Sequence, residues 1–179
     1  IRVPLIVHWP GQTKANTLSH AMVTGTDFYP TLLEMINVPR LPKQHVDGKS
    51  FVPALQGRPH DRGAIYWHFP HYSNHGYQSP GGAIRLGDYK LLEYFENGSV
   101  QLFDLKNDLS EKNDLSEIKP EITNKLRKML HDWRRDMDAK MPKVKTPESR
   151  RQSNAQPATG NNLPIDVARF APEWKVRDW

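Results

Sequence analysis

The stretch GGAIRLGDYKLLEYFENGSVQLFDLKND, residues 81–108, predicts three short antiparallel strands joined by two tight turns. Gly87-Asp88 interrupts the apolar run between the first two strands. Asn97-Gly98 is a dipeptide favoured in two-residue type I′ hairpins, in which both central residues have positive φ. We therefore expect a meander with a type I′ turn at its second corner.

Both faces of the middle strand carry apolar side chains, because successive residues point to opposite faces. One face carries Tyr89, Leu91, Glu93 and Phe95, and the other carries Lys90, Leu92, Tyr94 and Glu96. Neither face is purely polar, so another element must cover one of them.

Residues 120–139 predict the covering element, a helix of about five turns with Pro120 in its first turn. Its apolar side chains recur at spacings of three and four, which places them in one stripe. The stripe consists of Ile122, Leu126, Met129, Leu130, Trp133 and Met137. The basic side chains expected to stay in water are Lys125, Arg127, Lys128, Arg134 and Arg135. The sequence thus predicts an α+β unit, an antiparallel β-meander packed against a long C-terminal helix.

The first residues, IRVPLIVHWPG at 1–11, form a continuous apolar run that ends in Pro-Gly. Such a run is typical of a strand buried on both faces of a largely parallel sheet. Since that strand needs neighbours on both sides, we expect this chain to be the C-terminal portion of a larger protein. A short helix is predicted over 26–36, capped by Thr26 or Asp27, with one further helical turn within 46–57.

These segments predict three parts. Residues 1–57 are expected to be the end of an α/β domain, and residues 58–140 a small subdomain of antiparallel sheet plus helix. Residues 141–179 are rich in proline and basic residues and predict an extended tail.

The composition excludes several classes of site. The 179 residues include no cysteine, which excludes disulfides and thiolate zinc sites. From Lys140 onward, eight Lys or Arg against four Asp or Glu supply four of the five net positive charges, so the basic excess belongs to the tail. We therefore expect no nucleic-acid partner. No apolar stretch reaches about 18 residues, so no membrane span is expected.

His68 and His71 lie among aromatic residues in the segment AIYWHFPHY, beside a loop rich in glycine, serine and asparagine. A proline separates them and no third ligand follows at metal-site spacing, so the pattern favours a pocket wall over a metal site. A half-buried strand that packs its aromatic residues in the core is the alternative. Arg85 could bind an anionic group, or it could be a surface arginine paired with Asp88.

No complete catalytic apparatus is visible. The sequence contains no G-x-S-x-G, P-loop, G-x-G-x-x-G or H-E-x-x-H motif. We expect no catalytic residue and no metal ligand in this chain.

The order of the segments resembles the C-terminal third of type I sulfatases, over roughly residues 1–142. The ordered set is IRVPLIVHWPG, TDFYPTLLEMINVP, VDGKSFVPALQG, YWHFPHY, the 81–108 stretch and the long helix. The resemblance implies an alkaline-phosphatase-like α/β domain followed by a smaller domain with a four-stranded antiparallel sheet and a C-terminal helix.

The resemblance also implies hydrolysis of sulfate esters, with formylglycine made from a C/S-x-P-x-R motif and a calcium ion held by Asp and Asn. That motif is absent here, so we expect both groups upstream, in a missing N-terminal sulfatase domain. His68, His71 and Arg85 are the candidate contacts to a sulfated small molecule or sugar. The family resemblance suggests an extracytoplasmic location, periplasmic or secreted.

Two other functions stay open at this point. A related phosphoesterase of the same superfamily would use a similar scaffold with a different nucleophile and different metals. A carbohydrate-binding or adaptor module without catalysis would share the aromatic and histidine content.

Overall fold

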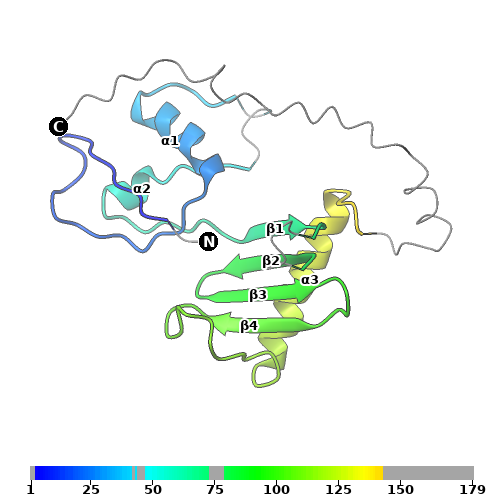
Figure 1. The fold of residues 1–179 in the computed structure, drawn as a ribbon. Coiled ribbons are helices and arrows are strands. Elements are labelled where there is room, and N and C mark those ends of the chain that lie inside the picture. The colour runs from blue at the N-terminus through cyan, green and yellow to red at the C-terminus, as the bar shows by residue number, and fades with distance from the viewer. Residues whose placement is uncertain (1–2, 42, 44–46, 73–78, 143–179) are drawn as a thin grey trace, which may run out of the picture. The chain divides into compact units, whose positions relative to one another are not determined.

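The computed structural model describes residues 3–41, 43, 47–72 and 79–142. Ile1–Met141 form one compact unit. Its elements, in chain order, are η1 (Gly25–Asp27), α1 (Phe28–Met35), α2 (Val52–Leu55), β1 (Ile65–Phe69), β2 (Gly81–Leu86), β3 (Tyr89–Tyr94), β4 (Val100–Asp104) and α3 (Pro120–Asp136) (Figure 1). No helix within the described ranges is long and apolar enough to cross a membrane. The predicted tail lies almost wholly outside the described residues.

The four strands form one antiparallel sheet in the order β1-β2-β3-β4, and α3 packs on one face of it (Figure 1). Each strand pairs with its neighbour in sequence, which makes the sheet a meander. The three strands of the 81–108 stretch and the long helix are confirmed. β1 supplies the fourth strand that the family resemblance implies.

The core lies between the sheet and α3. Five side chains are at most 2% exposed there: Ile84, Leu91, Leu102, Leu126 and Leu130. Each such side chain stabilises the fold by about 1.5–3 kcal/mol relative to exposure. At the margin of this core, the ring of Trp133 stacks on that of Tyr66 with centroids 4.9 Å apart. The alternation of β3 and the stripe of α3 therefore meet as their periodicities predict, except at Met137, which follows the end of α3 and is 59% exposed.

Arg134 is an exception to the predicted pattern of α3. It was expected to stay in water, but it is 8% exposed and its guanidinium contacts Glu93 on β3. The prediction for Arg134 is wrong because an acidic residue occupies the covered face of β3. A buried charged side chain is less costly when it pairs with a buried carboxylate than when it has no partner.

The turn at Asn97 is not of type I′. Gly98 has φ 69°, but Asn97 is not among the residues with positive φ, and five residues connect β3 to β4. The Asn97 Oδ1 instead accepts hydrogen bonds from the backbone N–H (3.0 Å) and the hydroxyl (2.7 Å) of Ser99. The Asn side chain thus closes the loop locally, as Asx turns do.

The outer edge of β4 is covered by the segment that follows it. The N–H of Leu102 donates to Oδ1 of Asp114 (3.0 Å), and the N–H of Leu115 donates to the carbonyl of Leu102 (2.8 Å). Both polar backbone groups of Leu102 that point away from β3 are therefore satisfied.

The predicted buried strand at the start of the chain is wrong for this structure. Residues 3–9 carry no strand, and Val3 and Ile6 are 82% and 92% exposed. A strand requires a hydrogen-bonded neighbour, and no strand of the described residues pairs with this segment. The turn after it does form, because the N–H of Thr13 donates to the carbonyl of Trp9 (2.9 Å).

The helix predicted over 26–36 is confirmed as η1 followed by α1. It ends where Asn37 takes φ 55°, which lets the N–H of Val38 donate to the carbonyl of Leu33 (2.8 Å). The predicted further helical turn is α2.

Candidate functional site

A pocket of about 500 Å³ lies at the end of the sheet where β3 and α3 both finish. The pocket is largely open to solvent rather than enclosed. It combines aromatic, cationic, acidic and apolar side chains. The lining residues are Glu93, Tyr94, Phe95, Gly98, His131, Arg134, Arg135, Asp138, Ala139 and Met141.

Glu93 forms the buried wall of this pocket and is 5% exposed. Its carboxylate accepts hydrogen bonds from Nε of Arg127 (2.9 Å), Nε2 of His131 (2.7 Å) and Nη2 of Arg134. Residues 127, 131 and 134 are spaced by four and three, so they lie on one face of α3. The helix thus brings three donors to one carboxylate of β3.

The environment of Glu93 keeps it ionised. Burial alone would raise its pKa, but the hydrogen bonds from His131, Arg134 and Arg127 outweigh burial, and the pKa is lowered. The fixed charges that line the pocket balance, with Arg134 and Arg135 against Glu93 and Asp138. Arg134 also lies over the ring of Phe95, with its guanidinium carbon 5.1 Å from the ring centroid.

This arrangement predicts loss of stability in acid. Because the folded-state pKa of Glu93 is lowered, its stabilising effect is complete above its ordinary pKa of 4.5 and disappears as the pH falls through the folded-state value. We expect the midpoint of urea unfolding to fall steeply below about pH 4.5. The Glu93→Gln variant should show a flatter pH dependence, and a wild-type slope in that variant would contradict the assignment.

His68 lies near this pocket, on β1. Its Nε2 donates to the carbonyl of Lys140 (2.9 Å), and its ring packs against Phe95 with centroids 5.4 Å apart. These contacts hold the chain that follows α3 against the edge of the sheet. His71 follows β1 and is exposed, with its ring edge-on to Phe69 at 6.0 Å.

Arg85 lies at the other end of the sheet. It pairs in register with Ile65 and Lys90, next to the β2–β3 turn, whereas His68 pairs with Gly82. Its Nε donates to the carbonyl of Gly87 (3.3 Å). Because its neighbour Ile84 faces α3, Arg85 points to the opposite face. The structure thus brings His68 and His71 to one end and leaves Arg85 apart from them.

Sequence reasoning missed Glu93, His131 and Arg134 as a group. The available signal was an acidic residue within the apolar face of β3, opposite basic residues spaced by three and four on the covering helix. Each of these two features is common in sequences and does not by itself indicate a site. The residues come together only because α3 packs on β3.

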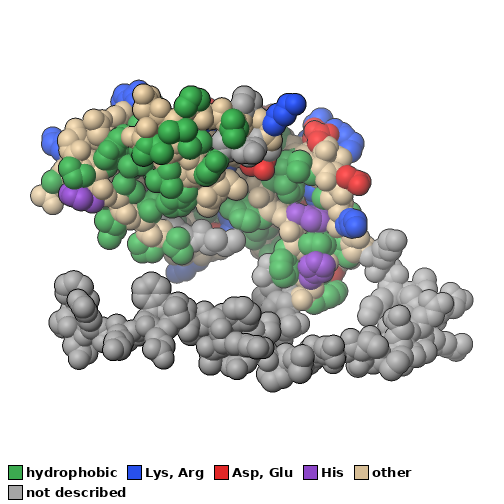
Figure 2. Space-filling view, turned by 90° about the horizontal axis from the view of Figure 1, so that it is seen from above, with side chains coloured by type: hydrophobic (Ala, Val, Ile, Leu, Met, Phe, Trp, Pro, Cys, Tyr) green, Lys and Arg blue, Asp and Glu red, His purple; other side chains and the backbone are tan. Residues whose placement is uncertain are grey.

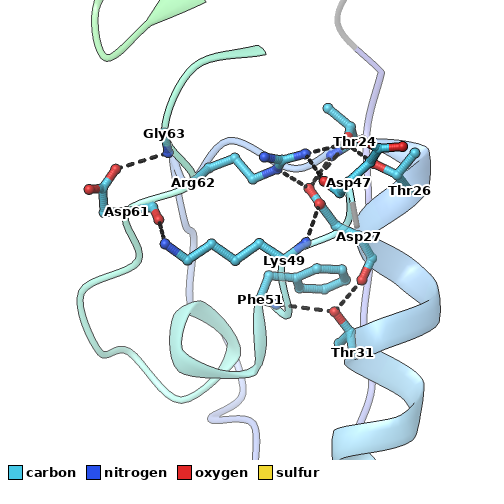
Figure 3. Close-up of polar contacts among 10 residues, drawn as sticks. All are labelled: Thr24, Thr26, Asp27, Thr31, Asp47, Lys49, Phe51, Asp61, Arg62 and Gly63. Atoms are coloured by element: carbon cyan, nitrogen blue, oxygen red, sulfur yellow. Dashed lines mark hydrogen bonds and ion pairs between the residues drawn. The ribbon is translucent and has the colours of Figure 1, made fainter. Parts of the chain in front are cut away.

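A second polar cluster surrounds Asp27, which is fully buried (Figure 3). Its carboxylate accepts hydrogen bonds from the N–H of Thr24, the N–H of Lys49 and Nε of Arg62, each at 2.8 Å. Thr31, one turn further along, donates to the Asp27 carbonyl (2.6 Å) and accepts from the N–H of Phe51 (3.1 Å). The cluster therefore joins α1 to the segments at 47–51 and 61–63.

The chemistry of Asp27 is that of a structural carboxylate. Burial would raise its pKa, but the backbone N–H groups of Lys49 and Thr24 and the Arg62 side chain outweigh burial and lower the pKa. With its oxygens occupied and no exposed surface, Asp27 cannot reach a substrate.

Neither calcium nor formylglycine fits the residues in hand. Within the described parts of the chain, no group of three His, Asp or Glu side chains could hold a metal ion. The full sequence contains no Cys and no S-x-P-x-R motif from which formylglycine could form. The pocket can bind and orient a ligand, but no step of catalysis is derived from either group.

Comparison with known families assigns the chain. The family model described as N-sulphoglucosamine sulphohydrolase, C-terminal, matches residues 1–136. The chain belongs to this family. The resemblance to the C-terminal portion of sulfatases is thereby confirmed.

Several curated sulfatases are similar to this chain. A sulfatase of Formosa agariphila is 33% identical over 74% of this chain and 27% of its own length. An N-acetylglucosamine-6-O-sulfatase of Bacteroides thetaiotaomicron is 32% identical over 64% and 21%, and mouse arylsulfatase K is 31% identical over 73% and 24%. The chain therefore spans about a quarter of the length of these relatives.

Solved structures agree with the family assignment. A structure described as BT4656 in complex with its substrate D-glucosamine-2-N,6-O-disulfate matches 81% of this chain and 30% of its own, with a TM-score of 0.65 and 27% identity. The structure of Ps i-CgsB matches 70% and 27%, with a TM-score of 0.60 and 27% identity. The antiparallel sheet and C-terminal helix of this chain thus have counterparts in these two solved structures.

Proposed function

We propose that this chain is the C-terminal portion of a sulfatase that hydrolyses sulfate esters, and that it shapes the substrate site. The family match over residues 1–136 carries the proposal. The nucleophile, the calcium ligands and the rest of an alkaline-phosphatase-like α/β domain would lie in a preceding part of the protein. This family assignment favours a sulfatase over a phosphoesterase or a non-catalytic module.

A sulfated sugar is the proposed substrate class. The pocket beside α3 is lined by the aromatic ring of Phe95 and by Arg135, whose side chain is 71% exposed, while Arg134 is held by Glu93. Aromatic faces pack on sugar rings, and guanidinium groups bind sulfate or carboxylate oxygens. Two similar proteins act on such compounds by name, the N-acetylglucosamine-6-O-sulfatase and the protein solved with D-glucosamine-2-N,6-O-disulfate. These names support the class without specifying the sugar.

Three residues are proposed to act at the substrate site, each in a different way: His71, His68 and Arg85. His71 is exposed at the sheet end that carries the pocket, which suits direct contact. His68 is bonded to Lys140 and suits positioning. Arg85 would have to contact a different part of the substrate, because it lies at the other end of the sheet.

Replacing His71 with alanine in the complete protein should raise KM about 2- to 10-fold with little change in kcat or thermal stability. This range corresponds to one lost hydrogen bond of about 0.5–1.5 kcal/mol. His68→Ala should instead lower thermal stability, because it frees the Lys140 carbonyl. His20→Ala, another exposed histidine, is the matched control. An unchanged KM in His71→Ala would remove that residue from the site.

The reaction itself is tested with the complete protein on matched sulfate and phosphate monoesters of the same sugar. Release of sulfate and not phosphate is expected. Preferential release of phosphate would establish the phosphoesterase, and binding of the sugar without turnover of either ester would favour the non-catalytic module. The 179-residue chain alone is expected to release neither ion.

A further inference from the structure

Tyr72 combines an exposed aromatic ring with a hydroxyl that is held in place. Its side chain is 67% exposed, more than any other aromatic side chain in the described part of the chain. Its hydroxyl nevertheless donates a hydrogen bond of 2.6 Å to Oε1 of Glu96. Tyr72 follows β1 and Glu96 follows β3, so the bond joins two segments that lie 24 residues apart. The ring is therefore held at the surface in one orientation.

The stability of the fold explains this pair poorly. Both side chains are exposed, and water competes for the polar groups of an exposed hydrogen bond. The ring of Tyr72 also buries little apolar surface. The hydrogen bond to Glu96 raises the pKa of the Tyr72 hydroxyl, so the hydroxyl remains a donor at neutral pH. The main effect of the pair is thus to present an aromatic ring to the solvent in a fixed orientation.

The neighbours of Tyr72 belong to the end of the sheet that carries the pocket. Glu96 directly follows Phe95, which lines the pocket. His71 precedes Tyr72 and is exposed, and its ring meets edge-on that of Phe69, which is 37% exposed. On the face shown in Figure 2, histidine side chains lie beside hydrophobic ones, with acidic and basic side chains close by. Aromatic rings with a few polar groups around them are typical of sites for small molecules.

We propose that the ring of Tyr72 is a stacking surface for the sugar ring of the substrate, and that Glu96 is the residue that positions it. This inference rests on the proposed function, hydrolysis of a sulfated sugar. One face of a cyclic sugar presents C–H groups, which pack on the face of an aromatic ring. Because the hydrogen bond to Glu96 already restricts the tyrosine, less conformational entropy is lost when the sugar binds. Stacking selects cyclic sugars over open-chain alcohols, whose C–H groups form no flat face.

The test compares cyclic sugar esters with their open-chain counterparts in the complete protein. The substrates are sulfated glucose, galactose and glucosamine, and the alditol obtained from each by reduction. Tyr72→Ala removes the ring, Tyr72→Phe keeps the ring without its hydroxyl, and Glu96→Ala removes the acceptor. Leu109→Ala is the matched control, since it truncates another large side chain that is 57% exposed. A thermal melt shows that each variant is folded, and Tyr72→Leu replaces Tyr72→Ala if that variant is not.

For the cyclic ester that the protein hydrolyses best, Tyr72→Ala should raise KM about 3- to 10-fold with little change in kcat, which is the size of one lost aromatic contact. KM for the matching alditol sulfate should stay unchanged. Tyr72→Phe and Glu96→Ala should each raise KM for the cyclic ester about twofold, and their double variant no further, because all three lack the same hydrogen bond. An unchanged KM in Tyr72→Ala, or an equal rise for the cyclic and open-chain esters, would overturn the proposal.

Binding of the unsulfated cyclic sugars separates this inference from the proposed function. Saturation-transfer difference NMR detects the sugar protons that contact the protein and requires no turnover. Loss of that signal in Tyr72→Ala, in a protein that releases no sulfate, would retain the stacking surface and remove the sulfatase function. Sulfate release with the same KM in Tyr72→Ala and the wild type would do the reverse. An equal signal in both proteins, or no signal in the wild type, would also remove the stacking surface.

Discussion

Glu93→Ala is expected to lower the free energy of unfolding by about 3–5 kcal/mol, because it leaves a buried arginine without its partner. Arg134 is 8% exposed and cannot regain water without moving away from the sheet. The other two donors to Glu93, Arg127 and His131, are 40% and 48% exposed, so their charges can be solvated. The cost should therefore fall mainly on Arg134. Urea denaturation followed by tryptophan fluorescence measures it.

A surface pair on the same helix provides the matched control. Lys128 contacts Asp132 with its side chain 77% exposed, so Lys128→Ala should change the free energy of unfolding by no more than about 0.5 kcal/mol. The double variant Glu93→Leu with Arg134→Met removes both buried charges and should recover much of the stability lost in Glu93→Ala. A Glu93→Ala variant no less stable than Lys128→Ala would show that the buried cluster contributes little.

Asp27→Ala is expected to cost about 3–5 kcal/mol in the part of the chain that precedes the sheet. It removes the acceptor of the part-buried backbone N–H groups of Thr24 and Lys49, and of the Arg62 guanidinium. Each unsatisfied buried donor costs about 1–3 kcal/mol. Local unfolding should follow, because Asp27 links α1 to two separate segments (Figure 3). Hydrogen exchange of residues 47–63 should accelerate in the variant, while exchange in β3 stays unchanged.

Arg62→Gln is the companion variant for Asp27. It removes the ion pair but leaves both backbone hydrogen bonds in place, so its effect should be smaller than that of Asp27→Ala. The exposed Glu34→Ala on α1 should have almost no effect. Equal effects of Arg62→Gln and Asp27→Ala would assign the stabilisation to the ion pair alone.

The sheet and α3 were predictable because the spacing of apolar residues within each short segment specifies the element. The alternation around Leu91 and the spacing of Leu126 and Leu130 each specify an element and its buried side, and the two sides meet in the core. The apolar run at 3–7 carries an equally strong local signal, yet no strand forms there. A strand forms only where a neighbouring strand supplies hydrogen-bond partners, and the sequence of residues 3–7 does not specify that neighbour.

The candidate site was predicted only in part, because it depends on contacts between elements. His68 and His71 do lie at the end of the sheet that carries the pocket, while Arg85 does not. The Glu93 cluster combines residues 34–41 positions apart, and no single segment contains its pattern. The type I′ prediction at Asn97 failed for a similar reason, since the side chain of Asn97 accepts a hydrogen bond from the Ser99 hydroxyl.

The cover over β4 has a consequence for how this chain meets other chains. An uncovered strand edge offers N–H and C=O groups to any extended peptide, and it is a common starting point for intermolecular β-sheet aggregation. By occupying both outward groups of Leu102, Asp114 and Leu115 deny that template to a neighbouring molecule. In the folded chain, the middle of β4 is therefore closed to pairing with a strand of another copy.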